Sequence, residues 1–118
     1  MAGTLVPLVL IPRYTTLSGA TTFQTIAMDV TDYEKAIVDF WRSAGANLGS
    51  ITPNFEESID QVTWSTCGGG PFADPGANSQ AQFQPDLTKR WFRITIALTG
   101  ANPVVTLWCI GFLMVRES

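Results

Sequence analysis

Apolar and polar residues alternate most regularly in the segment 89–98. On one side of an extended chain lie Phe92, Ile94, Ile96 and Leu98, and on the other Trp91, Arg93, Thr95 and Ala97. A period of two is typical of a strand that covers a core with one face and meets solvent with the other. The segment therefore predicts a half-buried antiparallel strand with Phe92 on its core side.

The segment 104–115 differs because it is apolar on both faces. A predicted turn at 99–103, with Gly100 and Pro103, separates it from the preceding strand. A strand with two apolar faces needs a cover on each side. One cover is the chain's own core, and we expect the other to be a partner subunit.

Shorter patterned stretches predict the remaining strands, at 5–11, 21–30, 36–43, 51–57, 62–66 and 80–84. Pro7 marks the first of these as an edge strand, and Pro53 should lie at the start of its strand or at an edge. Glycines predict a loop at 44–50, and the Gly- and Pro-rich segment 67–79 predicts a long irregular loop of the kind that often carries function.

Seven or eight short strands without a convincing helix predict an all-β fold, an antiparallel β-sandwich or jelly roll. Residues 1–118 should form one such domain. The start of the chain lacks the positive region of a signal peptide, so we interpret residues 1–14 as an N-terminal strand or arm that contacts a neighbouring subunit. On that interpretation, deleting residues 2–12 should abolish association while the core still folds.

Composition strengthens the expectation of a partner. The 118 residues are 46% hydrophobic but only 14% charged, against a typical charged share of about 25%. Apolar surface should therefore remain after folding, and large apolar patches mark interfaces. Arginine supplies most of the seven cations, and arginine is favoured in interface ion pairs. A surface rich in Thr, Ser, Gln and Asn is the alternative.

The same counts exclude several activities. The chain has no histidine, which rules out histidine-based triads, metal sites and proton shuttles. A net charge of −3 with scattered cations disfavours nucleic-acid binding. Adjacent Glu56 and Glu57 point to opposite faces of a strand and cannot form a glycosidase pair. The apolar run 104–115 is too short to cross a bilayer as a helix. We predict a non-enzymatic protein with no cofactor, no nucleic-acid partner and no membrane partner.

The cysteines and oxygen-rich loops predict no metal site. Cys67 and Cys109 fit no metal-ligand spacing, and we interpret them as buried free thiols, with a disulfide between them as the alternative. The loop 74–78 contains Asp74 and Asn78 but does not match the calcium-loop pattern.

The tryptophans leave two interpretations open. Most tryptophans in small sandwiches pack into the core or an interface. Trp91 lies opposite the core face of its strand, so it could contact a subunit. Exposed aromatic rings can instead stack on sugars, and Trp64 with Trp91 would form that platform.

Two stretches together resemble a known family. The segment 55–65, with Glu56-Glu57-Ser58 followed by Asp60 and Trp64, resembles a strand-turn-strand of galactose-binding-like (discoidin-like) jelly rolls. The segment 89–100, from Lys89 to Gly100, resembles the strand and turn that follow it there. Gln61 replaces the glycine usual after the turn aspartate. No sugar or calcium residues of the family can be placed here, so the resemblance implies a fold and, because small phage virion proteins reuse this sandwich, a virion context.

These observations predict a structural protein of a bacteriophage particle, made in the host cytoplasm, that decorates or cements the capsid or sits elsewhere in the particle. Its expected partners are capsid or other virion proteins and further copies of itself. A carbohydrate-binding module is the alternative. The expected interface residues are Leu5, Val6, Leu8, Leu10, Pro12, Arg13, Gly69, Pro71, Phe72, Trp91 and Arg93.

Overall fold

The structure is a computed structural model that describes residues 4–116. Within this range the chain forms eight strands and no helix, which confirms the all-β prediction, and no helix is available there to span a bilayer. The strands are β1 (Leu5–Ser18), β2 (Thr22–Gln24), β3 (Met28–Asp29), β4 (Tyr33–Arg42), β5 (Ala46–Ser58), β6 (Ser65–Thr66), β7 (Ser79–Phe83) and β8 (Trp91–Val115).

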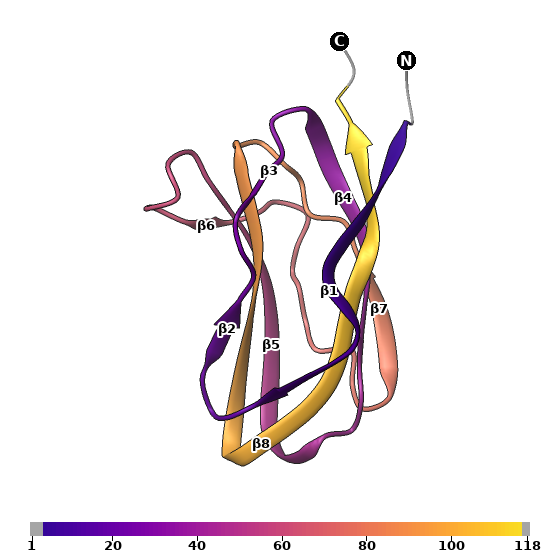
Figure 1. The fold of residues 1–118 in the computed structure, drawn as a ribbon, viewed down its shortest axis with the longest axis vertical. Coiled ribbons are helices and arrows are strands. Elements are labelled where there is room, and N and C mark those ends of the chain that lie inside the picture. Colours follow the sequence, from indigo (N-terminus) through magenta and orange to yellow (C-terminus); the bar gives the residue numbers. More distant parts are fainter. Residues whose placement is uncertain (1–3, 117–118) are drawn as a thin grey trace.

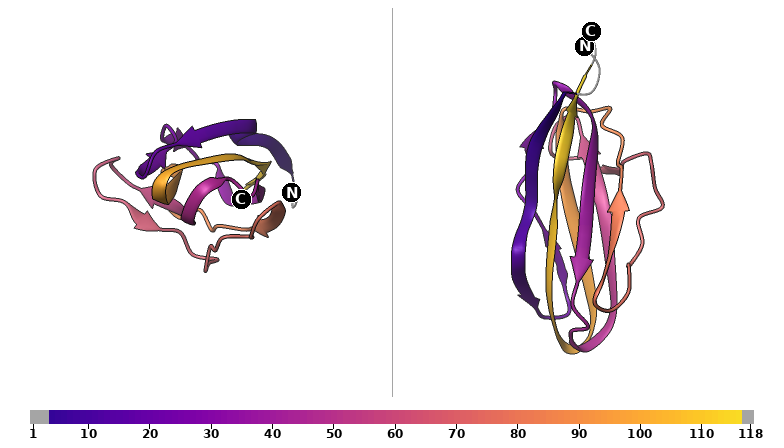
Figure 2. Two further views of the ribbon diagram at one scale, coloured as in Figure 1. Left: turned by 90° about the horizontal axis from the view of Figure 1, so that it is seen from below. Right: turned by 90° about the vertical axis from the view of Figure 1, so that its right-hand side faces the viewer.

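Strand β8 organises the whole sheet. It runs down one side of the molecule, reverses at the bottom of Figure 1 and returns on the other side. Its first half pairs with β5 on one edge and with β2 and β3 on the other, and its second half pairs with β4 and β1. All of these pairings are antiparallel. The sheet is thereby curled into the two layers of a sandwich, which measures 48 × 28 × 21 Å (Figure 2).

Aromatic side chains join the two layers in the core. The ring of Phe55 on β5 lies 6.0 Å from Phe92 on β8 and 5.8 Å from Phe83 on β7, and Phe83 in turn lies 6.3 Å from Phe40 on β4. The predicted alternation holds, since Phe92, Ile94, Ile96 and Leu98 are all buried. Burial of each such side chain contributes roughly 1.5–3 kcal/mol to stability before the conformational entropy lost on folding is subtracted.

The predicted turn at 99–103 is where β8 reverses, although ladder bonding continues through it. Gly100 has a φ of 129° and Asn102 a φ of 56°. A β-carbon on Gly100 would overlap the carbonyl oxygen of Asn47 and lie 2.8 Å from the nitrogen of Gly49. Glycine is therefore required both by the backbone angle and by the close approach of β5.

Two predicted strands are shorter than expected because side chains take over backbone hydrogen bonds. The segment 21–30 is interrupted between β2 and β3, where the hydroxyl of Thr25 accepts the bond from the Ile94 N–H at 3.1 Å. The segment 62–66 is strand only at β6, because the carboxylate of Asp60 accepts bonds from the Val62 and Thr63 N–H groups and extends the turn.

The start of β5 was misplaced, whereas the position of Pro53 was not. The predicted loop 44–50 is already part of β5 from Ala46, because its backbone pairs with β8 around the corner. Pro53 is buried within β5, but where it pairs with β8 no strand of the described chain lies on the other edge of β5. Its missing N–H therefore costs no ladder bond, in agreement with the prediction of an edge position.

The N-terminal segment is an integral strand of the sandwich. Strand β1 pairs with the second half of β8, and Leu8, Leu10 and Ile11 are only 4%, 9% and 7% exposed. Removing residues 2–12 would delete three core side chains, so the core would not remain intact as the sequence alone suggested. Residues 1–3 of the expected arm lie outside the described residues.

Gly111 generates a test of this packing. A β-carbon there would overlap the carbonyl oxygen of Ile37 and lie 2.7 Å from the α-carbon of Val38, both backbone atoms of β4. We expect Gly111→Ala to lower the free energy of unfolding by about 2 kcal/mol or more, as overpacking does, measured by urea denaturation.

The matched control is Gly68→Ala. There the added carbon meets the side-chain oxygen of Asp86 at 3.1 Å, and a side chain near the surface can move aside. A change within about 0.5 kcal/mol is expected, and an equal loss in both variants would contradict the assignment of Gly111 to a backbone contact.

Candidate functional site

An apolar surface lies on the outward side of the layer formed by β1, the second half of β8 and β4. Burial alternates along each strand, so the residues between the buried ones point outward. Val9 and Phe112 are 57% and 45% exposed. We call the outer face the set Leu5, Pro7, Val9, Lys35, Ile37, Asp39, Ile110, Phe112 and Met114.

A stack of planar groups stands beside the outer face. Trp41 on β4 and Trp108 on β8 are register partners, and their rings stack at 4.5 Å with an angle of 16°. Tyr14 meets Trp108 edge-on at 5.4 Å, and the guanidinium of Arg13 lies 4.7 Å from the same ring. Each contact contributes roughly 0.5–1 kcal/mol.

A bulge in β1 places the two residues that meet Trp108. The register with β8 shifts between Ile11 and Thr15, and Tyr14 has a φ of 61°. Bulges re-aim side chains in this way. The bulge is held by a bond from the Thr15 hydroxyl to the Pro12 carbonyl, 2.8 Å long.

The other two tryptophans each have an arginine against one ring face. The guanidinium of Arg93 lies 4.0 Å from the ring of Trp64 and donates to Glu56 at 2.9 Å. The guanidinium of Arg90 lies 4.9 Å from Trp91. Trp64 and Trp91 are half-buried, and Trp91 shares the outward side of its strand with Arg93, the arginine that lies on Trp64.

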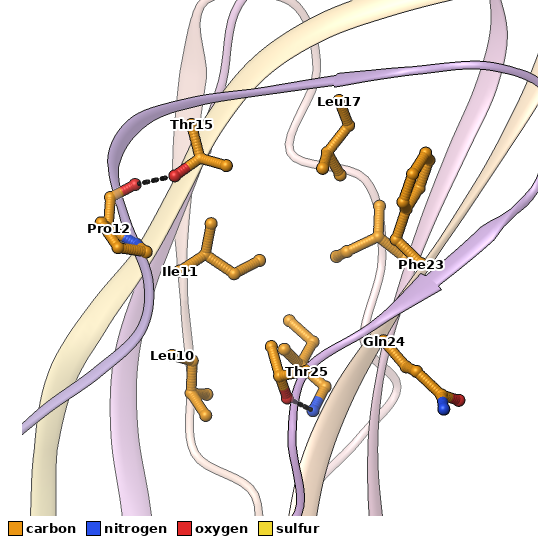
Figure 3. Close-up of a pocket in the computed structure, with 10 residues that line it drawn as sticks. Leu10, Ile11, Pro12, Thr15, Leu17, Phe23, Gln24 and Thr25 are labelled. Atoms are coloured by element: carbon orange, nitrogen blue, oxygen red, sulfur yellow. Dashed lines mark hydrogen bonds between the residues drawn. The ribbon is translucent and has the colours of Figure 1, made fainter.

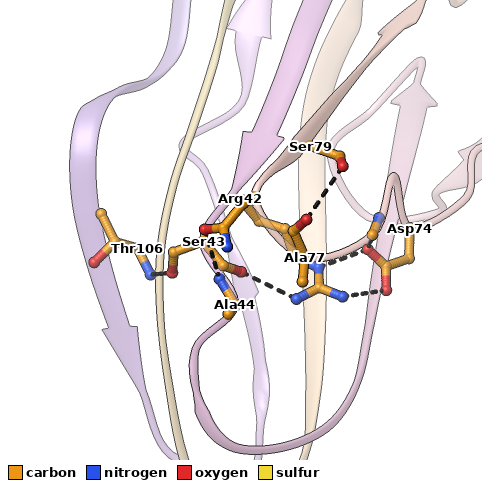
Figure 4. Close-up of polar contacts among 9 residues, drawn as sticks. Arg42, Ser43, Ala44, Asp74, Ala77, Ser79 and Thr106 are labelled. Carbon is orange, nitrogen blue, oxygen red and sulfur yellow. Dashed lines mark hydrogen bonds and ion pairs between the residues drawn. The ribbon is translucent and has the colours of Figure 1, made fainter.

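An ion pair fixes the long loop 67–78 to the end of β4. The guanidinium of Arg42 donates to both carboxylate oxygens of Asp74, at 2.6 and 2.8 Å, and to the carbonyl of Ser43 (Figure 4). Arg42 is buried. The bond from Arg42 holds the pKa of Asp74 below its usual value, and the Gly76 N–H adds to this effect.

Aromatic contacts attach the same loop to the core. Phe72 lies 4.8 Å from Phe55 and 5.7 Å from Phe83, so it packs within the chain. Gly69 and Pro71 are exposed. A β-carbon on Gly69 would overlap the carbonyl oxygen of Gln84, so here the glycine serves close packing of two backbones.

Two further polar side chains have partners within the chain. Asn78 accepts a bond from the Ala44 N–H, and Glu57 accepts from the Thr88 and Lys89 N–H groups. Glu56 and Glu57 do point to opposite faces, since only Glu57 is fully buried. Within residues 4–116 no cluster of cysteine and acidic side chains suits a metal ion.

Both thiols are inert by position. Cys67 and Cys109 are buried and unbonded, in agreement with the preferred interpretation. Burial raises the pKa of both thiols well above its usual value. Neither is therefore a candidate nucleophile.

A small apolar cavity of about 240 Å³ lies where the sandwich is open between β1 and β2 (Figure 3). Its lining is Leu10, Ile11, Pro12, Thr15, Leu17, Phe23, Gln24, Thr25, Ile94 and Ile96. No titratable side chain lines it, so the cavity offers packing space but no chemistry.

The structure places the interface residues predicted from the sequence in three different regions. Leu8 and Leu10 belong to the core, Val6 is half-buried, and Leu5, Pro12 and Arg13 are exposed along β1. Trp91 and Arg93 lie on the other layer. The loop residues are a third group, so the predicted set is not one surface.

The contribution of β4 to the outer face was not predicted from the sequence. Ile37, Asp39 and Trp41 are the outward positions of the segment 36–43, and the alternation of that segment would have identified them. The second apolar face predicted for 104–115 is present, because Ile110 and Phe112 lie on the outer face; its predicted cover stays a prediction.

The fold belongs to the class of antiparallel β-sandwich or jelly-roll domains. Among solved structures, the chain is similar to PBSX exported protein XepA, with a TM-score of 0.63 and 17% identity over 96% of this chain and 38% of that one. It thus spans well under half the length of XepA. It is also similar to the SPBc2 prophage-derived protein YomS, with a TM-score of 0.51 and 10% identity over 92% of this chain and 93% of that one.

A third similar structure is the CBM22-1 xylan-binding domain of Paenibacillus barcinonensis Xyn10C, with a TM-score of 0.54 and 12% identity over 99% and 98% of the two chains. No family model and no curated protein matches this chain. At these identities the likeness concerns the fold alone, and it agrees with the antiparallel β-sandwich or jelly roll predicted from the sequence.

The Arg42–Asp74 pair yields a prediction. We expect Asp74→Asn to lower the free energy of unfolding at pH 7 by about 2 kcal/mol, because it leaves a buried guanidinium without its counter-charge. The pKa of Asp74 is lowered by folding, so the pair stabilises the fold above the unfolded pKa and is lost as the pH falls through the folded value.

Urea denaturation of both proteins between pH 7 and pH 2 checks this. The difference between wild type and Asp74→Asn should be constant near neutral pH and shrink below about pH 4. A difference that is independent of pH would show that the carboxylate charge is not what matters.

Proposed function

We propose that this chain is a non-enzymatic structural protein of a bacteriophage particle, which acts through subunit contacts on its outer face. The observation that carries the proposal is the exposure of apolar side chains in contiguous rows on that face. Leu5, Val9 and Phe112 are 45%, 57% and 45% exposed there. An apolar sheet face of this kind in a chain with few charges is typical of a surface that a partner covers.

The comparisons support a particle context. YomS is prophage-derived, and XepA is an exported protein of PBSX. Both share the sandwich without sharing the sequence. In this proposal the chain is made in the host cytoplasm, joins capsid or other virion proteins, and forms one domain that serves as a rigid body.

The carbohydrate-binding alternative has one observation in its favour, the likeness to a xylan-binding sandwich. A sugar ring needs an accessible aromatic face. The facing sides of Trp41 and Trp108 are used against each other, and one face of Trp64 and one of Trp91 lie under arginines. We therefore favour the structural role.

Particle association tests the proposal. A tagged copy of the chain, expressed in the bacterium whose phage or prophage encodes it, should co-sediment with particles purified on a density gradient. Val9→Lys should reduce the co-sedimenting amount by at least about tenfold, because a charge in an apolar interface costs more than 1.4 kcal/mol.

Val62→Lys is the matched control. Val62 is 80% exposed in the turn that follows β5, away from the outer face, so this variant should associate like wild type. Circular dichroism confirms that both variants fold. Absence of the wild-type chain from particles, or equal association of the two variants, would refute the proposal.

Affinity electrophoresis in gels containing xylan tests the carbohydrate-binding alternative. We expect no retardation of the wild-type protein. Retardation that Trp64→Ala or Trp91→Ala abolishes without loss of stability would favour a carbohydrate-binding module instead.

A further inference from the structure

The outer face is a grid of three rows that the strand register defines. Across β1, β8 and β4 the rows are Leu5–Met114–Lys35, then Pro7–Phe112–Ile37, then Val9–Ile110–Asp39. The first row holds two apolar side chains and the positive Lys35. The third row holds two apolar side chains and the negative Asp39. The middle row is apolar throughout.

This arrangement is complementary to itself under a two-fold rotation. Two identical faces that cover each other are related by an axis lying in the plane between them. If the axis runs across the strands along the middle row, Ile37 meets Ile37 and Phe112 meets Phe112 of the other copy. The first row then covers the third, and Lys35 of each copy faces Asp39 of the other.

The other in-plane orientation is unfavourable. An axis parallel to the strands would lay β4 of one copy over β1 of the other. Lys35 would then face Leu5, and Asp39 would face Val9. Two charges per copy would be buried against apolar groups, which costs several kcal/mol. The charges therefore select one orientation as well as one partner.

We propose that a second copy of this chain covers the outer face, with the strands of the two copies antiparallel and with reciprocal Lys35–Asp39 ion pairs. The inference rests on the proposed function, because it uses the same face, and it adds the identity of the occupant. The two faces pack as two sheets of a sandwich do, about 10 Å apart and crossed by about 30°, a rotation that a long lysine side chain accommodates.

Each charge is available for this pairing. The ammonium of Lys35 lies 3.6 Å from Asp86 within the chain, and the two side chains are 34% and 45% exposed. An exposed pair at that distance contributes little, so the lysine can exchange partners. Asp39 is half-buried on β4 beside Ile110.

A charge exchange tests the geometry. Sedimentation equilibrium of the purified full chain should show a dimer. Lys35→Glu and Asp39→Lys should each raise the dimer dissociation constant by about tenfold or more, because each places two like charges together twice per dimer. The double variant Lys35→Glu/Asp39→Lys should return to within about threefold of wild type.

Asp86→Ser is the matched control, since it removes the internal partner of Lys35 without touching the grid. It should leave the dimer as tight as wild type or tighter. Failure of the double variant to recover, or single variants that dimerise like wild type, would overturn the proposed orientation.

The test also distinguishes this inference from the proposed function. A wild-type chain that remains a monomer at 100 times the concentration used for particle binding, yet co-sediments with particles through Val9, would refute the second copy as occupant and leave the structural role intact. A dimer that never associates with particles would support the inference and refute the role.

Discussion

The structure depends on the hydrogen bonding of β8 along both of its edges. Five other strands, β1 to β5, pair with it directly, and β6 and β7 join through β5 and β4. Because one strand runs through both layers, the reversal at Gly100 sets the position of each layer relative to the other. The inward residues of its two halves, Phe92 and Leu107 among them, then face a common core, and the outward residues of its second half form the middle of the outer face.

Few charges are left over once this core is built. Arg42 secures a loop, while Arg13, Arg90 and Arg93 each lie against a tryptophan ring. Arginine suits this role because its planar cation stacks on rings and is weakly hydrated. The chain has few charged residues, and most of its arginines are already engaged within the fold. The only charged members of the outer face are Lys35 and Asp39.

Much of the fold follows from local pattern. The two halves of β8, the strand at β4 and the short β7 were predictable because alternation and apolar runs are properties of neighbouring residues. The interruption at Thr25 and the late start of β6 were not, because they depend on which distant group a side chain bonds. The site shows the same limit. The apolar second face of 104–115 was visible in the sequence, but its union with Ile37 and Trp41 required the register between β8 and β4.

The two ends of the described chain lie together, where the Val115 N–H donates to the carbonyl of Thr4 at 2.9 Å. Both ends therefore emerge at one end of the long axis (Figure 2), next to the Leu5–Met114 row of the outer face. A domain with such adjacent ends can be inserted into a surface loop of another protein without stretching the host chain.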